Sequence, residues 1–119
     1  MSLKGAAGGL YSTVGDLYKW DQALYTDQLV SQETLDKMFT SHVRIGGGKY
    51  YGYGWIISKP KGYRIIEHSG SLPGFLAQLA RYPDDQVTII ILKNLRSGTR
   101  DLQVIRINRG LVEIVFEEK

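Results

Sequence analysis

Cysteine is absent from this 119-residue chain, which excludes a disulfide scaffold, a thiol nucleophile and thiolate metal ligands. Long apolar runs are absent as well. The most apolar stretch, Val87 to Leu92, is far too short to cross a bilayer, so we expect no membrane segment in this chain. Only two histidines occur, His42 and His68, and their positions match no metal-binding motif. We therefore expect neither a metal ion nor another cofactor.

A strong excess of one charge is missing too, because the net charge is only +3. Several arginines gather near the C-terminus, but acidic residues lie between them, and they do not alternate with aromatic residues that could stack on bases. This pattern indicates a solvated face, and we expect no nucleic-acid partner.

The length and the composition, with 43% hydrophobic and 23% charged residues, are typical of one globular domain spanning residues 1–119. The start of the chain has neither the length nor the apolar centre of a signal peptide. We interpret residues 1–5 as a leader or a disordered segment. The sequence leaves the cellular compartment open.

Two short helices are predicted in the first forty residues. Ser12-Thr13 followed by Asp16 resembles a helix N-cap, and apolar residues at helical spacing predict a helix from about Val14 to Tyr25. Ser31 opens a second helix, which carries Glu33 in its first turn. His42 follows this helix, where a histidine commonly caps the C-terminal end.

An antiparallel sheet of about four strands is expected after a flexible loop at residues 46–48. The four predicted strands are Tyr53 to Ser58, Tyr63 to Glu67, Phe75 to Tyr82 and Val87 to Lys93. Turn sequences at residues 59–62 and 83–86 join neighbouring strands as hairpins. The last strand is apolar on both faces, which predicts a central strand covered on both sides.

The segment of residues 99–117 fits two structures equally well on pattern alone. Its apolar residues form a helix with a wide apolar face, interrupted by Gly110. They also tolerate the alternation of a hairpin that turns at residues 108–110.

One literal motif match is interpreted as a coincidence. Ser58-Lys59-Pro60-Lys61 spells Ser-x-x-Lys, in which a lysine one helical turn after a serine accepts the hydroxyl proton. Here the four residues fall in a predicted turn, and Pro60 interrupts them. The nucleophile elbow Gly-x-Ser-x-Gly is also absent around Ser69.

Longer stretches carry a resemblance to a known family. They read GGLYSTVGDLYKWDQALY, LVSQETLDKMFTSH, YGYGWII and HSGSLPGFLAQLARYPDDQVTIIILKN, in consistent order from about Ala6 to Asn94. Together they resemble the C-terminal part of the serine β-lactamase and penicillin-binding-protein-like hydrolases, which include class C β-lactamases, D-alanyl-D-alanine carboxypeptidases and related esterases. The implied fold is α+β: an antiparallel sheet with two N-terminal helices and a C-terminal helix, part of a β-lactamase/transpeptidase-like fold. The resemblance thus favours a helix for residues 99–117.

The resemblance also implies site residues. In that family a helix with Ser-x-x-Lys, a Tyr-x-Asn loop and a strand with Lys-Thr-Gly or His-x-Gly build the site, and His68-Ser69-Gly70 matches the strand. His68 would then hydrogen-bond a tyrosine or the substrate carboxylate, and Ser69 would line the same edge. Gly70 would let the substrate approach the backbone. The backbone N–H of Ser71 would be one of two oxyanion-hole donors.

The chain departs from the family pattern in lacking Tyr-x-Asn and a credible Ser-x-x-Lys. We therefore expect a C-terminal fragment of a serine hydrolase whose full-length parent acts on β-lactam, D-alanyl peptide or ester substrates. The fragment alone would be inactive. An alternative is a free-standing, non-catalytic binding module that keeps the pocket wall for a peptide or acyl ligand. A third hypothesis, with Ser69 or Ser71 as nucleophile, lacks a suitably spaced general base. An incomplete sheet would expose an edge, which predicts a homo-oligomer that covers it.

Overall fold

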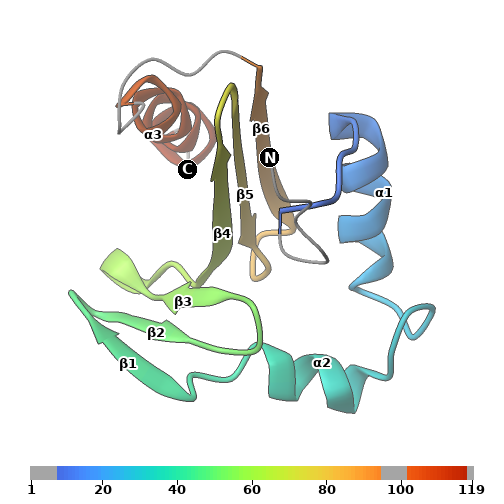
Figure 1. Ribbon diagram of the computed structural model, residues 1–119. Helices are drawn as coiled ribbons and strands as arrows, with labels where there is room; N and C mark the ends of the chain where they lie inside the picture. The colour runs from blue at the N-terminus through green and yellow to red at the C-terminus, as the bar shows by residue number, and fades with distance from the viewer. Residues whose placement is uncertain (1–7, 95–101, 118–119) are drawn as a thin grey trace.

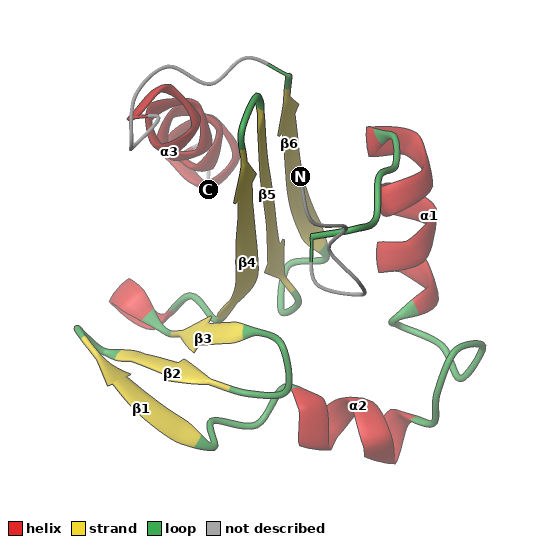
Figure 2. Ribbon diagram, in the orientation of Figure 1, coloured by secondary structure: helices red, strands yellow, loops and turns green. Residues whose placement is uncertain are grey.

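The computed structural model describes residues 8–94 and 102–117, and it shows three α-helices and one six-stranded sheet. The helices are α1 (Val14–Ala23), α2 (Gln32–Met38) and α3 (Leu102–Glu117). The strands are β1 (Val43–Gly46), β2 (Lys49–Tyr51), β3 (Ile56–Ser58), β4 (Ile65–Leu72), β5 (Phe75–Tyr82) and β6 (Val87–Lys93). A short 3₁₀ turn, Pro60–Gly62, joins β3 to β4. The α+β class is confirmed, whereas the sheet has six strands and not about four (Figure 2).

All neighbouring strands pair antiparallel in chain order, from β1 at one edge to β6 at the other. Figure 1 shows α1 and α3 on opposite sides of the long strands β4 to β6, with α2 near the shorter strands. Of the two alternatives for residues 99–117, the structure has the helix from Leu102 onward. The residues before it, 95–101, lie outside the described part of the chain, as does the expected leader of residues 1–5.

Both N-terminal helices begin where the sequence predicts. The Thr13 hydroxyl accepts a hydrogen bond from the Asp16 N–H at 3.1 Å, and the Ser31 hydroxyl accepts one from the Thr34 N–H at 3.2 Å. Each bond satisfies an N–H that has no partner inside its helix. Helix α1 ends at Ala23, two residues before the predicted end. His42 Nε2 lies 2.7 Å from the Lys37 carbonyl oxygen, so this side chain caps the last turn of α2.

Strands β1 and β2 were not predicted. Of residues 46–48, expected to be a flexible loop, Gly46 ends β1 and Gly47-Gly48 form the tight turn to β2; all three glycines have positive φ. This backbone conformation costs glycine little. The two strands are almost entirely exposed, and with four and three residues they are too short for a periodicity that would distinguish them from a loop in the sequence.

The remaining strands match the prediction in order and mostly in length. β5 and β6 have the predicted bounds, while β3 begins three residues later than expected. β4 continues five residues beyond Glu67, the predicted end, because β5 pairs with it as far as Leu72. The prediction of a central β6 is wrong: within the described residues β6 is an edge strand. Its apolar faces are explained by α1 and α3, which both contact it.

Two apolar cores hold the helices against the sheet. Under α1 and α2 the buried residues are Leu24, Leu35, Phe39, Trp55 and Ile66. Under α3 they are Ala80, Tyr82, Ile89 and Phe116. The sheet is therefore a middle layer, and its position relative to the helices is set from both sides.

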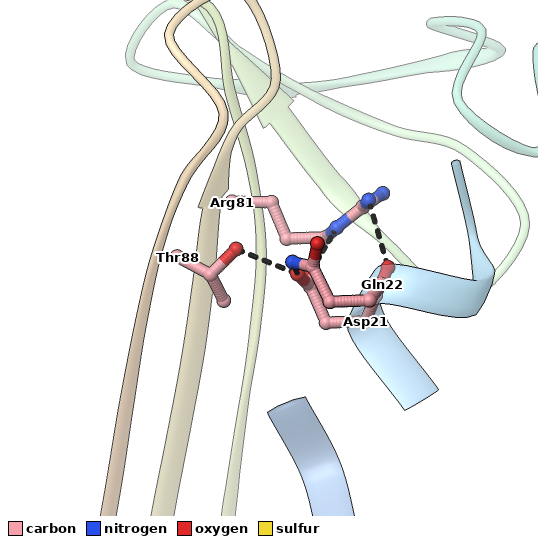
Figure 3. A network of polar contacts seen from close by, with 4 residues as sticks. All are labelled: Asp21, Gln22, Arg81 and Thr88. Carbon is pink, nitrogen blue, oxygen red and sulfur yellow. Dashed lines mark hydrogen bonds and ion pairs between the residues drawn. The ribbon is translucent and has the colours of Figure 1, made fainter. Parts of the chain in front are cut away.

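A buried ion pair fixes α1 on the sheet (Figure 3). Arg81 on β5 donates from Nε to Asp21 Oδ1 at 2.5 Å, and both side chains are almost fully buried. Thr88 on β6 and Gln22 donate to the other carboxylate oxygen at 2.8 and 3.0 Å. The guanidinium lies over the ring of Tyr25, 4.7 Å from its centroid. Both carboxylate oxygens thus have partners, as a buried charge requires.

Candidate functional site

The four predicted site residues, His68 to Ser71, are consecutive, exposed residues in the second half of β4. β3 pairs with β4 only at residues 65–67, whereas β5 pairs with it from Ile66 to Leu72. On the β3 side, no described strand pairs with residues 68–72. This half of β4 therefore presents backbone N–H and C=O groups along one free edge, to which an extended ligand could bind.

His68 makes two hydrogen bonds at the start of this free edge. Its Nδ1 lies 2.6 Å from the Ser69 carbonyl oxygen, and its Nε2 lies 3.1 Å from the hydroxyl of Tyr51 on β2. The two rings meet edge to face, with centroids 6.1 Å apart. The imidazole is thus held in one orientation although it is exposed.

Gly70 is not required by the packing of the described residues. It lies in a regular strand opposite Ala77, and its φ is not positive. A Cβ at this position would find Ala77 Cβ at 3.8 Å as its nearest neighbour, which is an ordinary contact. The missing side chain therefore leaves open space beside the backbone of β4.

Ser69 borders a cavity of about 320 Å³ between the sheet and α3. The lining residues are Lys49, Ile56, Glu67, His68, Ser69, Gln78, Val104, Ile105 and Asn108. Glu67 is the acidic group of the cavity: it accepts a hydrogen bond from Gln78 at 3.2 Å and lies 3.8 Å from the Lys49 ammonium. Burial raises the pKa of the nearby Tyr82, and the negative charge of Glu67 raises it further. Ser71 lies two residues farther along β4, opposite Leu76.

The Ser58-to-Lys61 match does not have the geometry of a catalytic Ser-x-x-Lys. Ser58 is the last residue of β3 and is buried, while Lys61 lies in the 3₁₀ turn with a positive φ of 51°. The two residues are therefore not one turn apart on a helix. This agrees with the interpretation of the motif match as a coincidence.

Neither a metal-ligand cluster nor a membrane-spanning helix is found in residues 8–94 and 102–117. This part of the chain contains no group of three histidine or acidic side chains that could hold a metal ion. None of its helices is long and apolar enough to cross a membrane.

Tyr51 contacts the candidate site residue His68, and sequence reasoning did not single it out. It lies 17 residues before its partner His68, and the two meet only because β3 lies between β2 and β4 in the sheet. The stretch YGYGWII, which begins with Tyr51, belongs to the family resemblance and is the one signal that could have indicated it. Nothing in its local pattern distinguishes Tyr51 from Tyr53.

Comparison with known proteins identifies the relatives of this chain. The model of the Beta-lactamase family matches residues 1–113. Penicillin-binding protein 4* of Bacillus subtilis is 38% identical over 101 residues, which cover 82% of this chain and 22% of that protein. The D-alanyl-D-alanine-carboxypeptidase/endopeptidase AmpH of Escherichia coli is 28% identical over 120 residues, which cover 81% of this chain and 31% of that protein.

Solved structures agree with these matches. A penicillin-binding protein from Bacillus halodurans superposes with a TM-score of 0.71 at 28% identity, covering 83% of this chain and 30% of that one. The octameric penicillin-binding protein homologue from Pyrococcus abyssi gives a TM-score of 0.74 at 28% identity, covering 87% of this chain and 24% of that one. This chain thus spans between about a fifth and a third of the length of these relatives. From the family match and this shared fold, we conclude that the chain belongs to the β-lactamase family of serine β-lactamase and penicillin-binding-protein-like hydrolases.

Proposed function

We propose that this chain supplies one wall of a serine acyl-transfer site and acts as the C-terminal part of a hydrolase for β-lactam, D-alanyl peptide or ester substrates. The observation that carries the proposal is the free edge of β4, on which His68, Ser69, Gly70 and Ser71 stand in order. The names of the relatives, among them a D-alanyl-D-alanine-carboxypeptidase, support this choice of substrate class.

Each of the four residues has a role in this proposal. The substrate backbone lies along the free edge, and Gly70 leaves the space for its approach. The backbone N–H of Ser71 donates to the oxyanion, which is worth about 3 kcal/mol when the rest of the site is in place. His68 and Ser69 provide polar contacts beside the reacting group. The nucleophile and its lysine come from sequence outside this chain, because Ser58 and Lys61 do not form a helical pair.

Ligand titration tests the wall directly. We expect N-acetyl-D-alanyl-D-alanine to shift the backbone amide resonances of residues 69–72 in ¹H–¹⁵N spectra of the chain, with weak, saturable binding. The L,L stereoisomer is the matched control and should leave these resonances in place. If the D,D peptide shifts no resonance of β4, or if both isomers act alike, the proposed role of this edge is wrong.

Covalent labelling tests whether the chain lacks a nucleophile of its own. Intact-mass spectrometry after incubation with a penicillin, or with a fluorophosphonate, should show the unmodified mass of the chain. A single stoichiometric adduct on Ser58, Ser69 or Ser71 would show that the chain carries its own nucleophile. The absence of an adduct together with stereospecific peptide binding would support the wall assignment. Such binding is also what the alternative, a non-catalytic binding module, requires.

The proposal extends to a partner, a second copy of the chain. Within residues 8–94 and 102–117, β6 is the last strand of the sheet, with helices over both faces and no strand on its outer side, so a further strand could pair along it. The relative from Pyrococcus abyssi is octameric, which supports self-association in this family. We propose a homo-oligomer in which copies pair along this edge.

A further inference from the structure

The hydrogen bonds of His68 determine which of its ring nitrogens carries the proton. A carbonyl oxygen only accepts hydrogen bonds, so the contact of 2.6 Å between Nδ1 and the Ser69 carbonyl requires a proton on Nδ1. In the neutral ring Nε2 is then an acceptor, and the Tyr51 hydroxyl, 3.1 Å away, must donate to it. The structure therefore defines one tautomer, with the proton on Nδ1.

The backbone of Tyr51 is held from both sides, so its hydroxyl has a defined position. Tyr51 pairs with Val43 on β1 and with Ile56 on β3. Its carbonyl oxygen accepts a hydrogen bond from the His42 N–H at 3.1 Å. The side chain is half-buried, in contrast to the exposed ring of His68. The more rigid partner of the pair is thus the tyrosine, and it can orient the histidine.

The chain contains a natural comparison in its other histidine. The ring of His42 stacks on that of Tyr53, with centroids 4.4 Å apart and an angle of 9° between the planes. Its hydrogen bond, however, runs from Nε2 to the Lys37 carbonyl oxygen. By the same reasoning His42 carries its proton on Nε2. The two histidines should therefore be opposite tautomers, each next to a tyrosine but only one hydrogen-bonded to it.

We infer that Tyr51 is a positioning residue for His68 in the proposed acyl-transfer site; the inference rests on the proposed function of the β4 edge. The Tyr51 hydroxyl holds the imidazole with its proton on Nδ1 and its Nε2 lone pair occupied. A neutral His68 in this state has no N–H left to offer to a substrate carboxylate. The tyrosine thereby decides which hydrogen bonds the histidine can make when a ligand arrives.

The test is a two-bond ¹H–¹⁵N spectrum of the imidazole rings, recorded on the unliganded chain at a pH at which both rings are neutral. The wild-type chain should show the proton of His68 on Nδ1 and that of His42 on Nε2. In Tyr51→Phe the tautomer ratio of His68 should move toward Nε2–H by roughly 3- to 10-fold, the usual net effect of one hydrogen bond. The control Tyr53→Phe should leave both rings as in wild type.

Two results would overturn the inference: a wild-type His68 that carries its proton mainly on Nε2, or a tautomer ratio that Tyr51→Phe leaves unchanged. The wild-type spectrum decides the first point even if the variant does not fold. Because Tyr51→Phe makes an Nε2–H available to the peptide carboxylate, binding of N-acetyl-D-alanyl-D-alanine should tighten by roughly 3- to 10-fold in this variant. A peptide that binds neither protein refutes the proposed function itself, whereas an unaltered tautomer refutes only the role of Tyr51.

Discussion

Two glycines of the sheet region differ in what a side chain would meet. A Cβ on Gly52 would overlap the Met38 carbonyl oxygen and lie 3.0 Å from the Thr40 carbonyl oxygen. A Cβ on Gly70 would meet only Ala77, at 3.8 Å. Gly52 is therefore explained by the packing of the backbone itself. Gly70 is not, which agrees with a role in ligand approach.

Alanine substitutions should separate these two roles. Gly70→Ala is expected to leave the free energy of unfolding unchanged or to raise it by up to about 1 kcal/mol, because alanine loses less chain entropy on folding. It should abolish the D-alanyl peptide shifts on β4. Gly52→Ala should lower the free energy of unfolding by about 1–3 kcal/mol, since the backbone must move. Urea unfolding measures both, and equal destabilisation by the two variants would assign Gly70 a packing role.

Among single residues, the family motif by itself predicts His68, Ser69, Gly70 and Ser71 as site residues. The motif does not predict that they lie on an exposed strand that is paired along one side only. It also does not predict the hydrogen bond between Tyr51 and His68. A motif identifies residues that are adjacent in the chain. The tyrosine belongs to another strand, and its contact with His68 depends on the register of β2, β3 and β4.

At the scale of elements, a buried ion pair attaches α1 to the sheet, and the sequence of the helix alone does not predict this pair. Asp21 occupies a helix position where a charged residue would ordinarily face water. It is fully buried here because Arg81, 60 residues later, and Thr88 provide its partners. Helix α1 therefore cannot slide along β5 and β6 without breaking a buried ion pair.

Removing this carboxylate should strongly destabilise the protein. We expect Asp21→Ala to lower the free energy of unfolding by about 3–5 kcal/mol, because the Arg81 charge stays buried without its partner. The control on the same helix is Asp16→Ala, which removes an exposed carboxylate 3.8 Å from Lys19. Its effect should not exceed about 1 kcal/mol. Similar losses in chemical denaturation of the two variants would contradict the importance of the buried pair.

On the scale of the whole molecule, the sheet lies between two helical layers, and in the described part of the chain its outermost strands are β1 and β6. The β1 edge is short and bent by an irregularity in its pairing with β2, features that discourage further pairing. The β6 edge is longer and regular, with seven residues paired to β5 without a break. Self-association is therefore expected at β6.

Light scattering at micromolar concentration should show a dimer or a larger oligomer. Hydrogen exchange should find slow exchange at alternate β6 amides that do not face β5, since a second copy pairs with them. On dilution to monomer these amides should exchange faster, while those bonded to β5 stay protected. A monomer at every concentration would refute the proposed pairing.

The sequence by itself determined the features that depend on a few neighbouring residues. Thr13 and Ser31 began the helices, and the turn at residues 83–86 joined two strands whose bounds were predicted correctly. The tertiary structure alone decided the contacts between distant segments. Strands β1 and β2 were too short for a periodicity to reveal their pairing, and β6 was an outermost strand of the described sheet where a central strand was expected. Tyr51 met His68 across 17 residues, and Asp21 met Arg81 across 60. Caps and turns are formed by local hydrogen bonds, whereas register and burial follow from how the whole chain packs.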